Sequence, residues 1–310
     1  MSVVSSVCVT VPATTANLGP GFDCIGAALT LYNELKFIRE EINPNKNLVI
    51  TVTGSEATKV ATDESNLVYQ AFIKFFQHVQ QTAPPAKIEI KLGVPLARGL
   101  GSSATAIVGG LIGANVLAGE VLTLSEVMEL AIAMEGHPDN VVPALLGGCR
   151  LAATSDRGWA ICDIPWCQDV VPVVAIPDFE LSTSEARQVL PAQVSRQDAI
   201  FNTAHLGLLL RGLETGNQNW LRAALQDKLH QPYRKKLINN YDEINAAALS
   251  AGAYGMVISG AGPTLLALTN TDNSQAVAAA MAYEWQNKGI KAQVQTLQID
   301  NQGATSVVQG

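Results

Sequence analysis

A short stretch rich in glycine and serine carries the clearest chemical signal in this sequence. Residues 95–105 read PLARGLGSSAT and connect an alternating strand pattern to a long apolar run. Gly99 and Gly101 allow positive φ and close approach of a ligand to the backbone. Ser102 and Ser103 stand where a helix would begin, and the free N–H groups of a first helical turn favour an anion. We expect this stretch to bind phosphate.

Two better-known phosphate loops fit the same residues less well. A P-loop needs a lysine before its last hydroxyl residue, and Ser102 occupies that place. The spacing of a dinucleotide-binding loop is met by Gly99, Gly101 and Ala104, but residues 95–98 separate them from the preceding strand. The acidic residue expected about 20 positions on is Glu120, which follows a helical pattern instead of a strand. A nicotinamide-dependent dehydrogenase therefore stays the minor alternative.

Composition excludes several classes of function. The chain has 310 residues, 48% of them hydrophobic and 15% charged, and a net charge of −7. These values favour a sizeable core and leave no electrostatic footprint for nucleic acid. The five cysteines form no Cys-x-x-Cys pair, and the four histidines show no metal-ligand spacing. The first 35 residues contain no Lys or Arg, and the longest apolar run is short and glycine-rich. We expect a cytoplasmic protein without a membrane span.

The elements that must position the glycine stretch do not alternate regularly. Strand patterns cover residues 7–11, 34–39, 48–53, 87–92, 148–154, 159–162, 170–175, 255–259, 264–269 and 291–297. Helical patterns cover residues 63–79, 102–117, 125–135, 197–213, 232–249 and 274–287. This order favours an α+β fold over a doubly wound sheet. After Pro177, helical periodicity becomes dominant in the sequence. We divide the chain into an N-terminal domain, 1–168, and a C-terminal domain, 169–310.

Three separated segments together resemble one protein family. They read VPATTANLGPGFDCIGAAL at 11–29, PLARGLGSSAT at 95–105 and ISGAGPTLLAL at 258–268. In this order, over nearly the whole chain, they resemble the small-molecule kinases grouped around galactokinase, homoserine kinase, mevalonate kinase and phosphomevalonate kinase. The resemblance implies two domains, an N-terminal one like ribosomal protein S5 domain 2 and a C-terminal ferredoxin-like one. ATP and substrate would bind between them.

Two further segments narrow the resemblance to the members that phosphorylate homoserine. They read EGHPDNVVPALLGG at 135–148 and STSEARQVLP at 182–191. Residues 10–15 contain no Lys, Arg or His, whereas the mevalonate and galactose members carry a basic residue there. The resemblance implies Mg²⁺-dependent transfer of a phosphoryl group from ATP to the hydroxyl of L-homoserine, a step toward threonine. Another carboxylate-bearing alcohol and a regulator without turnover are the alternatives. The family is often dimeric, so a homodimer stands as an expectation beside a monomer.

The resemblance also implies roles for individual residues. ATP contacts are implied for Asn66, Pro95, Leu96, Ala97, Arg98, Gly99, Leu100, Gly101, Ser102, Ser103, Ala104 and Thr105. Substrate contacts are implied for Asn17, Asp23, His137, Arg187, Arg234 and Gly260, with the two arginines holding the carboxylate. Catalysis is implied for Asp139 and Asn140, with Asp139 either orienting or deprotonating the hydroxyl. Ser102 and Glu135 are implied as Mg²⁺ ligands, with Glu129 as the alternative to Glu135. The turn at 260–264 would pack against the phosphate-binding stretch.

Overall fold

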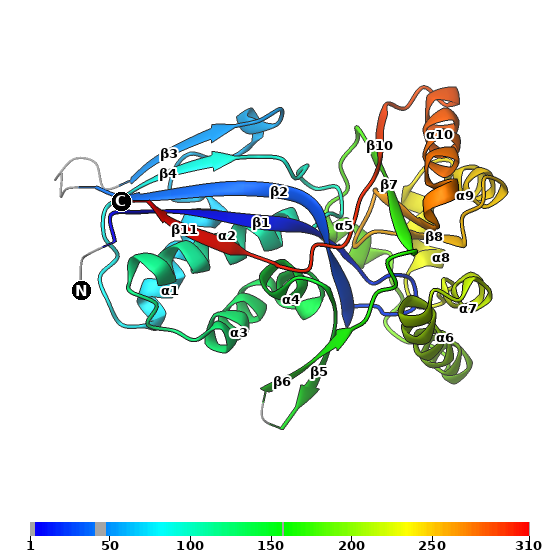
Figure 1. The fold of residues 1–310 in the computed structure, drawn as a ribbon, viewed down its shortest axis with the longest axis horizontal. Helices are drawn as coiled ribbons and strands as arrows, with labels where there is room; N and C mark the ends of the chain where they lie inside the picture. Colours follow the sequence, from blue (N-terminus) through cyan, green and yellow to red (C-terminus); the bar gives the residue numbers. More distant parts are fainter. Residues whose placement is uncertain (1–3, 41–47, 157, 310) are drawn as a thin grey trace.

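The computed structural model describes residues 4–40, 48–156 and 158–309. Figure 1 shows its elements, which are β1 (Ser6–Ala16), β2 (Ile25–Arg39), β3 (Leu48–Thr53), η1 (Ala57–Lys59), α1 (Leu67–His78), β4 (Ala86–Lys91), α2 (Ser102–Leu117), α3 (Leu124–Glu135), α4 (Pro138–Leu146), β5 (Cys149–Ser155), β6 (Gly158–Ile164), β7 (Val171–Pro177), α5 (Thr183–Gln188), α6 (Arg196–Thr215), α7 (Gln218–Ala224), α8 (Gln231–Arg234), η2 (Lys235–Leu237), α9 (Tyr241–Ser250), β8 (Gly255–Ile258), β9 (Leu265–Thr269), α10 (Thr271–Asn287), β10 (Ala292–Thr296) and β11 (Thr305–Gln309). The α+β prediction is confirmed. Among the described residues, no helix is both long and apolar enough to cross a membrane.

Helices α1, α2, α3 and α4 lie on one face of the first sheet (Figure 1). Its main strand order is β11-β1-β2-β4-β3, and β5 joins β6 to β2. Among the described strands of this sheet, only the β3–β4 pair is parallel. Helix α2 lies buried in the middle, between the sheet and α1. A Cβ at Gly113 would come within 2.3 Å of the Phe37 ring, so glycine lets this helix approach β2 closely.

The second sheet has four antiparallel strands in the order β10-β7-β9-β8. This order, with helices after the first and third strands, is that of the β-α-β-β-α-β ferredoxin-like arrangement. Apolar side chains of α9 and α10 share one core with this sheet. A second core joins the sheet to α6, α7 and the inner ends of β1 and β2. The two sheets are therefore tied together by a common apolar core.

Several elements differ from the sequence expectation. The first two strands run inward to Ala16 and from Ile25, well beyond the predicted 7–11 and 34–39. The helix predicted over 232–249 is divided into α8, η2 and α9. Asn240, which takes a left-handed φ of 63°, separates η2 from α9. Helices α4, α5 and α7 and strand β11 were not predicted. Because β11 pairs with β1, residues 305–309 lie in the first sheet. The division of the chain into domains 1–168 and 169–310 remains a proposal.

Candidate active site

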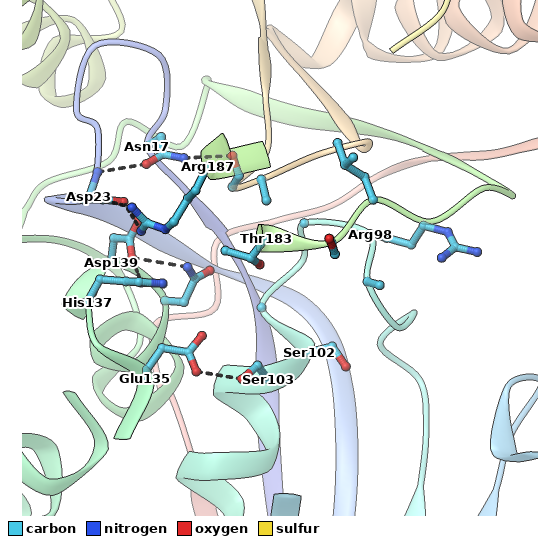
Figure 2. Close-up of a pocket in the computed structure, with 18 of the residues that line it drawn as sticks. Asn17, Asp23, Arg98, Ser102, Ser103, Glu135, His137, Asp139, Thr183 and Arg187 are labelled. Atoms are coloured by element: carbon cyan, nitrogen blue, oxygen red, sulfur yellow. Dashed lines mark hydrogen bonds and ion pairs between the residues drawn. The ribbon is translucent and has the colours of Figure 1, made fainter. Parts of the chain in front are cut away.

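A cavity of about 340 Å³ lies where the two halves meet. Its walls come from the 17–23 loop, the phosphate-binding stretch, the α3–α4 junction, α5, α8 and the 260–261 turn. The predicted residues that line it are Asn17, Asp23, Ala97, Arg98, Gly99, Gly101, Ser102, Ser103, Glu135, His137, Asp139, Asn140, Arg187, Arg234 and Gly260. Figure 2 shows Asp23 and Arg187 beside His137 and Asp139, with Glu135 and Ser103 nearby. Residues scattered over the sequence are thus brought into one site.

The phosphate-binding stretch ends in the open first turn of α2. Gly101 is the N-cap with φ 68°, so no side chain caps the first N–H groups of this helix. Ser102 and Ser103 are its first two residues, one position later than the cap that the sequence suggested. Thr14 lies beside Gly101, and its Oγ1 donates a hydrogen bond to Asn140 Oδ1 at 2.8 Å. Uncapped N–H groups and the positive end of a helix dipole face the cavity, which suits an anion.

The 260–264 turn packs against the phosphate-binding stretch, as expected. The hydroxyl of Ser259 donates to the carbonyl of Gly99 at 2.7 Å, and Thr264 N donates to Arg98 O at 3.2 Å. Gly99 has φ 74°, and a Cβ there would lie 2.2 Å from Ser259 O. The backbones of the two loops are therefore in direct contact.

The two glutamate candidates occupy different surroundings. Glu135, the last residue of α3, accepts a hydrogen bond at Oε2 from the Ser103 hydroxyl at 2.7 Å. Glu129 is exposed on α3 and lies beside Gly158 in the β5–β6 hairpin, outside the cavity. The serine beside Glu135 is Ser103, where we expected Ser102. Successive helical residues point about 100° apart, so only one of the two serines faces the end of α3.

The start of α4 carries a compact polar group. His137 Nδ1 lies 2.6 Å from Asp139 Oδ1, and Asn140 Nδ2 donates to the same oxygen at 3.3 Å. Asp139 is buried, and its hydrogen bond raises the pKa of His137. A Cβ at Gly26 would come within 1.7 Å of the Asp139 carbonyl, so glycine lets α4 begin close against β2. The group holds a carboxylate in a fixed position at the cavity wall (Figure 2).

An ion pair spans the opposite wall. Arg187 Nη1 and Nη2 donate to the two carboxylate oxygens of Asp23 at 3.0 and 2.8 Å. Asn17 orders the same loop, since its Oδ1 accepts from Asp23 N at 3.0 Å and its Nδ2 donates to Gly260 O at 2.9 Å. Figure 2 shows Asp23 and Arg187 above His137 and Asp139. The bidentate pair raises the pKa of Arg187.

Arg234 is a buried cation whose hydrogen bonds run to backbone carbonyls. Its side chain is 2% exposed, and it donates from Nε to Ala186 O and from Nη1 to Gly260 O. Within the described part of the chain, no carboxylate lies within 4.0 Å of its guanidinium. Burial, and then the neighbouring Arg187, lower its pKa to about 10, so it stays charged at neutral pH. A buried charge of this kind calls for an anion.

The remaining predicted ATP residues lie beside the cavity or behind it. Asn66 and Leu96 line a smaller apolar pocket of about 140 Å³ that shares Ser102 and Ser103 with the cavity. Asn66 also caps α1, accepting from Val68 N and Tyr69 N. Leu100, Ala104 and Thr105 belong to the phosphate-binding stretch but are buried, and Pro95 lies outside the cavity. These four can shape the stretch without contacting a ligand in the cavity.

Arg98 lines the cavity but directs its charge elsewhere. Its guanidinium donates to the carbonyls of Leu96, Pro177 and Asp178 at 2.7, 2.9 and 3.0 Å. Figure 2 shows this group turned away from the other labelled residues. The side chain therefore fastens the phosphate-binding stretch to the end of β7. From the sequence alone, an arginine in such a stretch is predicted to bind phosphate. Its contacts with carbonyl groups are known only from the structure.

Four cavity residues were not predicted, namely Leu181, Ser182, Thr183 and Ala261. Ser182 caps α5 in a capping box with Glu185. The Ser-x-x-Glu spacing at 182–185 is the signal that could have placed this helix start in the site. Thr183 follows it and offers a hydroxyl to the cavity (Figure 2).

Comparisons with known proteins agree with this geometry. Residues 66–148 match the model of the GHMP kinases N terminal domain, and residues 209–287 match that of the GHMP kinases C terminal domain. The chain is 74% identical to a homoserine kinase of Nostoc punctiforme over 99% of this chain and 100% of that one. It is 73% identical to a homoserine kinase of Microchaete diplosiphon over the full length of both.

Solved structures give the same result. A crystal structure of homoserine kinase from Cytophaga hutchinsonii matches with a TM-score of 0.89 and 29% identity, covering 99% of both chains. A mevalonate kinase of L. major matches with a TM-score of 0.71 and 17% identity, covering 94% of this chain and 95% of that one, which supports the fold alone. The chain therefore belongs to the GHMP kinases, a family of ATP-dependent phosphotransferases.

Proposed function

We propose that this chain transfers the terminal phosphoryl group of ATP to the side-chain hydroxyl of L-homoserine, giving O-phospho-L-homoserine. The relatives that match over its whole length carry that name. The observation that carries the proposal is Arg234, a buried cation that has no acidic partner among the described residues and lies in the same cavity wall as the Arg187–Asp23 pair. This arrangement suits a ligand with both a carboxylate and an ammonium.

Charge balance explains why a free amino acid fits this wall. Without a ligand, Arg187 is neutralised by Asp23, whereas the hydrogen bonds of Arg234 within the described residues go to two uncharged carbonyls. A substrate carboxylate would pair with Arg234 and Arg187, and the substrate ammonium would pair with Asp23. Each of these three charges then keeps a partner, whereas a plain carboxylic acid would leave Asp23 unpaired. Asn17 would hold Asp23 in place during this exchange.

The nucleotide phosphates fit the other end of the cavity. The uncapped first turn of α2 and the Gly99–Gly101 backbone can donate N–H groups to phosphate oxygens. The adjoining apolar pocket beside Asn66 would take the adenine. Phosphoryl transfer depends mainly on positioning and charge stabilisation, and these rigid donors supply both.

Magnesium fits the pair formed by Glu135 and Ser103. Their side-chain oxygens are hard ligands, 2.7 Å apart at the cavity wall. Among the described residues, no three His, Cys, Asp or Glu side chains gather to hold a metal by themselves. Such a small protein contribution suits Mg²⁺, which binds largely through phosphates and water. When bound, it would neutralise charge on the phosphate oxygens. We therefore propose Ser103 in place of Ser102, and Glu135 over Glu129.

The acceptor hydroxyl would lie near Asp139. The His137 and Asn140 side chains fix Asp139 Oδ1, so the carboxylate has one orientation toward the cavity. It can accept a hydrogen bond from the hydroxyl and align its oxygen with the phosphorus, or it can take the proton.

The test is ADP release from Mg-ATP with L-homoserine, L-serine, mevalonate or galactose offered separately. We expect turnover with L-homoserine, and a KM for it that rises about 10–100-fold in Arg187→Ala as charge-assisted hydrogen bonds are lost. Arg196→Ala is the matched control, because Arg196 is exposed at the start of α6 and outside the cavity. Both variants should keep the KM for ATP.

Three outcomes would change the assignment. Turnover with mevalonate or another alcohol, but none with L-homoserine, would keep the kinase and replace its substrate. ATP binding without any turnover would favour a regulator. A change in NADH fluorescence without ATP binding would favour the dehydrogenase alternative.

A homodimer and a cytoplasmic location also stay proposals. Light scattering on a sizing column would distinguish one copy of the 32.8 kDa chain from two. Imaging of the chain in its own cells would test the location.

A further inference from the structure

Three polar residues outside the cavity form a buried network behind its substrate wall. Asn202 lies on α6, and Asp227 and His230 precede α8. Their exposed fractions are 4%, 8% and 0%, and none of them lines the cavity. Buried polar side chains are usually hydrogen-bonded, and bonds to side-chain and backbone atoms hold these three in place, although His230 Nδ1 has no partner among the described residues. The substrate and phosphate contacts proposed above use none of the three.

Asp227 organises the backbone that leads into α8. Its carboxylate accepts from Asn202 Nδ2 at 2.7 Å, and from the N–H groups of Leu229, His230 and Gln231 at 2.9, 2.9 and 2.6 Å. Helix α8 ends at Arg234, the buried cation of the cavity. The network therefore sets the start of the helix that delivers this arginine.

The network also holds the substrate loop at 17–23 by two of its carbonyls. His230 Nε2 lies 2.8 Å from Gly19 O, and Asn202 Nδ2 donates to Pro20 O at 3.2 Å. A carbonyl can only accept, so His230 Nε2 carries the proton. Burial lowers the pKa of His230, which keeps the ring neutral. The loop is thus fastened to the second half of the chain.

The loop needs such fastening because its backbone is strained. Asn17, Leu18 and Gly19 take φ values of 73°, 45° and 83° in succession, and Asp23 takes 57°. Left-handed backbone at non-glycine residues costs free energy and persists only where surrounding contacts hold it. Without the two carbonyl contacts, the loop that carries Asp23 would relax.

Phe22 links the network to both arginines. The His230 and Phe22 rings are stacked, with centroids 5.1 Å apart and planes 22° apart. The guanidinium carbons of Arg234 and Arg187 lie 5.1 and 5.7 Å from the centroid of the same Phe22 ring. The negative face of an aromatic ring attracts cations, which offsets repulsion between two neighbouring guanidinium groups.

We propose that His230 and Phe22 are positioning residues for the substrate's charged groups. His230, fixed by Asp227 and Asn202, holds the 17–23 loop in its strained form. It also seats Phe22 beneath Arg187 and Arg234. The side chains proposed to bind the substrate carboxylate and ammonium, Arg187, Arg234 and Asp23, are therefore positioned by residues that do not contact the substrate. This proposal rests on the proposed function for its substrate, but the loop positioning can be tested without it.

Two substitutions separate the two contacts of His230. His230→Phe keeps a ring to stack on Phe22 and loses the donor to Gly19, whereas His230→Gln keeps a donor and loses the ring. Phe22→Leu removes the aromatic face and leaves an apolar side chain. The control is His78→Phe, since His78 is exposed at the end of α1. His230→Gln and Phe22→Leu keep the proposal testable if His230→Phe does not fold.

The first readout follows the loop itself. Cys24 adjoins Asp23, is half-buried, and has a pKa raised to about 11 by burial and by Asp139 and Asp23. Its alkylation rate is measured by peptide mass spectrometry, with exposed Cys162 as the internal reference. We expect alkylation at Cys24 relative to Cys162 to rise at least about tenfold in His230→Phe, as one anchoring hydrogen bond is lost. Unchanged ratios in all folded variants would overturn the proposal, whatever the substrate.

The second readout separates positioning from general damage. For His230→Phe and Phe22→Leu, we expect the KM for L-homoserine to rise about tenfold while the KM for ATP stays within about twofold of the parent value. His230→Gln should recover part of the loss. Equal rises in both KM values would indicate general damage and overturn the positioning role. If the parent releases no ADP with L-homoserine, the proposed function fails, and the Cys24 ratio alone decides the positioning.

Discussion

The contact between the Gly99 backbone and the 259–262 turn gives a prediction that can be worked out in numbers. Gly99 has φ 74°, and in Gly99→Ala the new Cβ would meet Ser259 O at 2.2 Å, Gly262 N at 2.8 Å and Gly262 O at 2.9 Å. These are backbone atoms, and the turn is held by hydrogen bonds from Gly262 N to Ser259 O and from Gly260 N to Ala16 O. The two loops must therefore separate by about 1 Å to reach van der Waals distance.

The expected loss has two parts. Left-handed backbone at alanine costs about 1–2 kcal/mol. Overpacking against rigid neighbours costs about 1–3 kcal/mol more. A total of about 2–5 kcal/mol would lower the melting temperature by about 4–10 °C in a chain of this size. A 1 Å shift of the phosphate-binding stretch would also lower kcat/KM about 100-fold.

Gly289→Ala isolates the strain from the contact. Gly289 has φ 73°, almost the same as Gly99, and no atom lies within 4 Å of its Cβ position. It should lose only about 1–2 kcal/mol and keep the parent kcat/KM. Thermal melts and ADP release on both variants are the measurements. Equal melting temperatures and equal activities for the two would refute the reasoning from packing.

Three further predictions concern other parts of the site. In Glu135→Gln, the Mg²⁺ concentration for half-maximal ADP release should rise at least about tenfold, whereas exposed Glu129→Gln should match the parent; identical Mg²⁺ titrations of the two would contradict the choice of Glu135. The hydrogen bond that His137 donates to Asp139 raises the pKa of His137 above 6.5, so its stabilisation is complete below 6.5 and is lost as pH rises through the raised pKa. The difference in melting temperature between parent and His137→Gln should therefore be larger at acidic pH than near pH 9, and a constant difference would count against this reasoning. Arg98→Met leaves three carbonyls without their donor and should lower the free energy of unfolding by about 3–5 kcal/mol in urea melts. The control is Arg211→Met, since Arg211 is exposed and paired with Glu214. If Arg98→Met lost no more stability than this control, Arg98 would not fasten the stretch to β7.

The elements whose sequence pattern has one clear structural cause were predictable from the sequence. The apolar face of α1 and the alternation in β4 marked both elements, because each has one buried side. The glycine stretch marked the start of α2, since glycine takes the left-handed backbone found at Gly101 without the strain that other residues incur. The grouping of Arg187, Arg234 and Asp139 in one cavity came from the family resemblance, because no local pattern links residues so far apart.

Elements that depend on distant contacts were missed. Helix α4 begins at Pro138 and contains Pro143, so propensity argued against it, and burial against the first sheet stabilises it. Helix α5 has only six residues. Strand β11 is exposed along its whole length and is defined by its pairing with β1. The carbonyl partners of Arg98 come from β7 and the loop after it, which no spacing in the sequence indicates.

The pairing of β11 with β1 has a consequence for how the chain is made. Ser6 lies opposite Gln309, so segments from the two extremes of the sequence are neighbours, and the whole second sheet is inserted between β6 and β11. During synthesis, β1 leaves the ribosome long before β11 exists, and its outer edge stays open to pairing with other chains. A circular permutant that joins the two ends and opens an exposed loop elsewhere would make these strands consecutive. Their pairing would then become a local hairpin, formed early, and the exposed edge would be covered from the start.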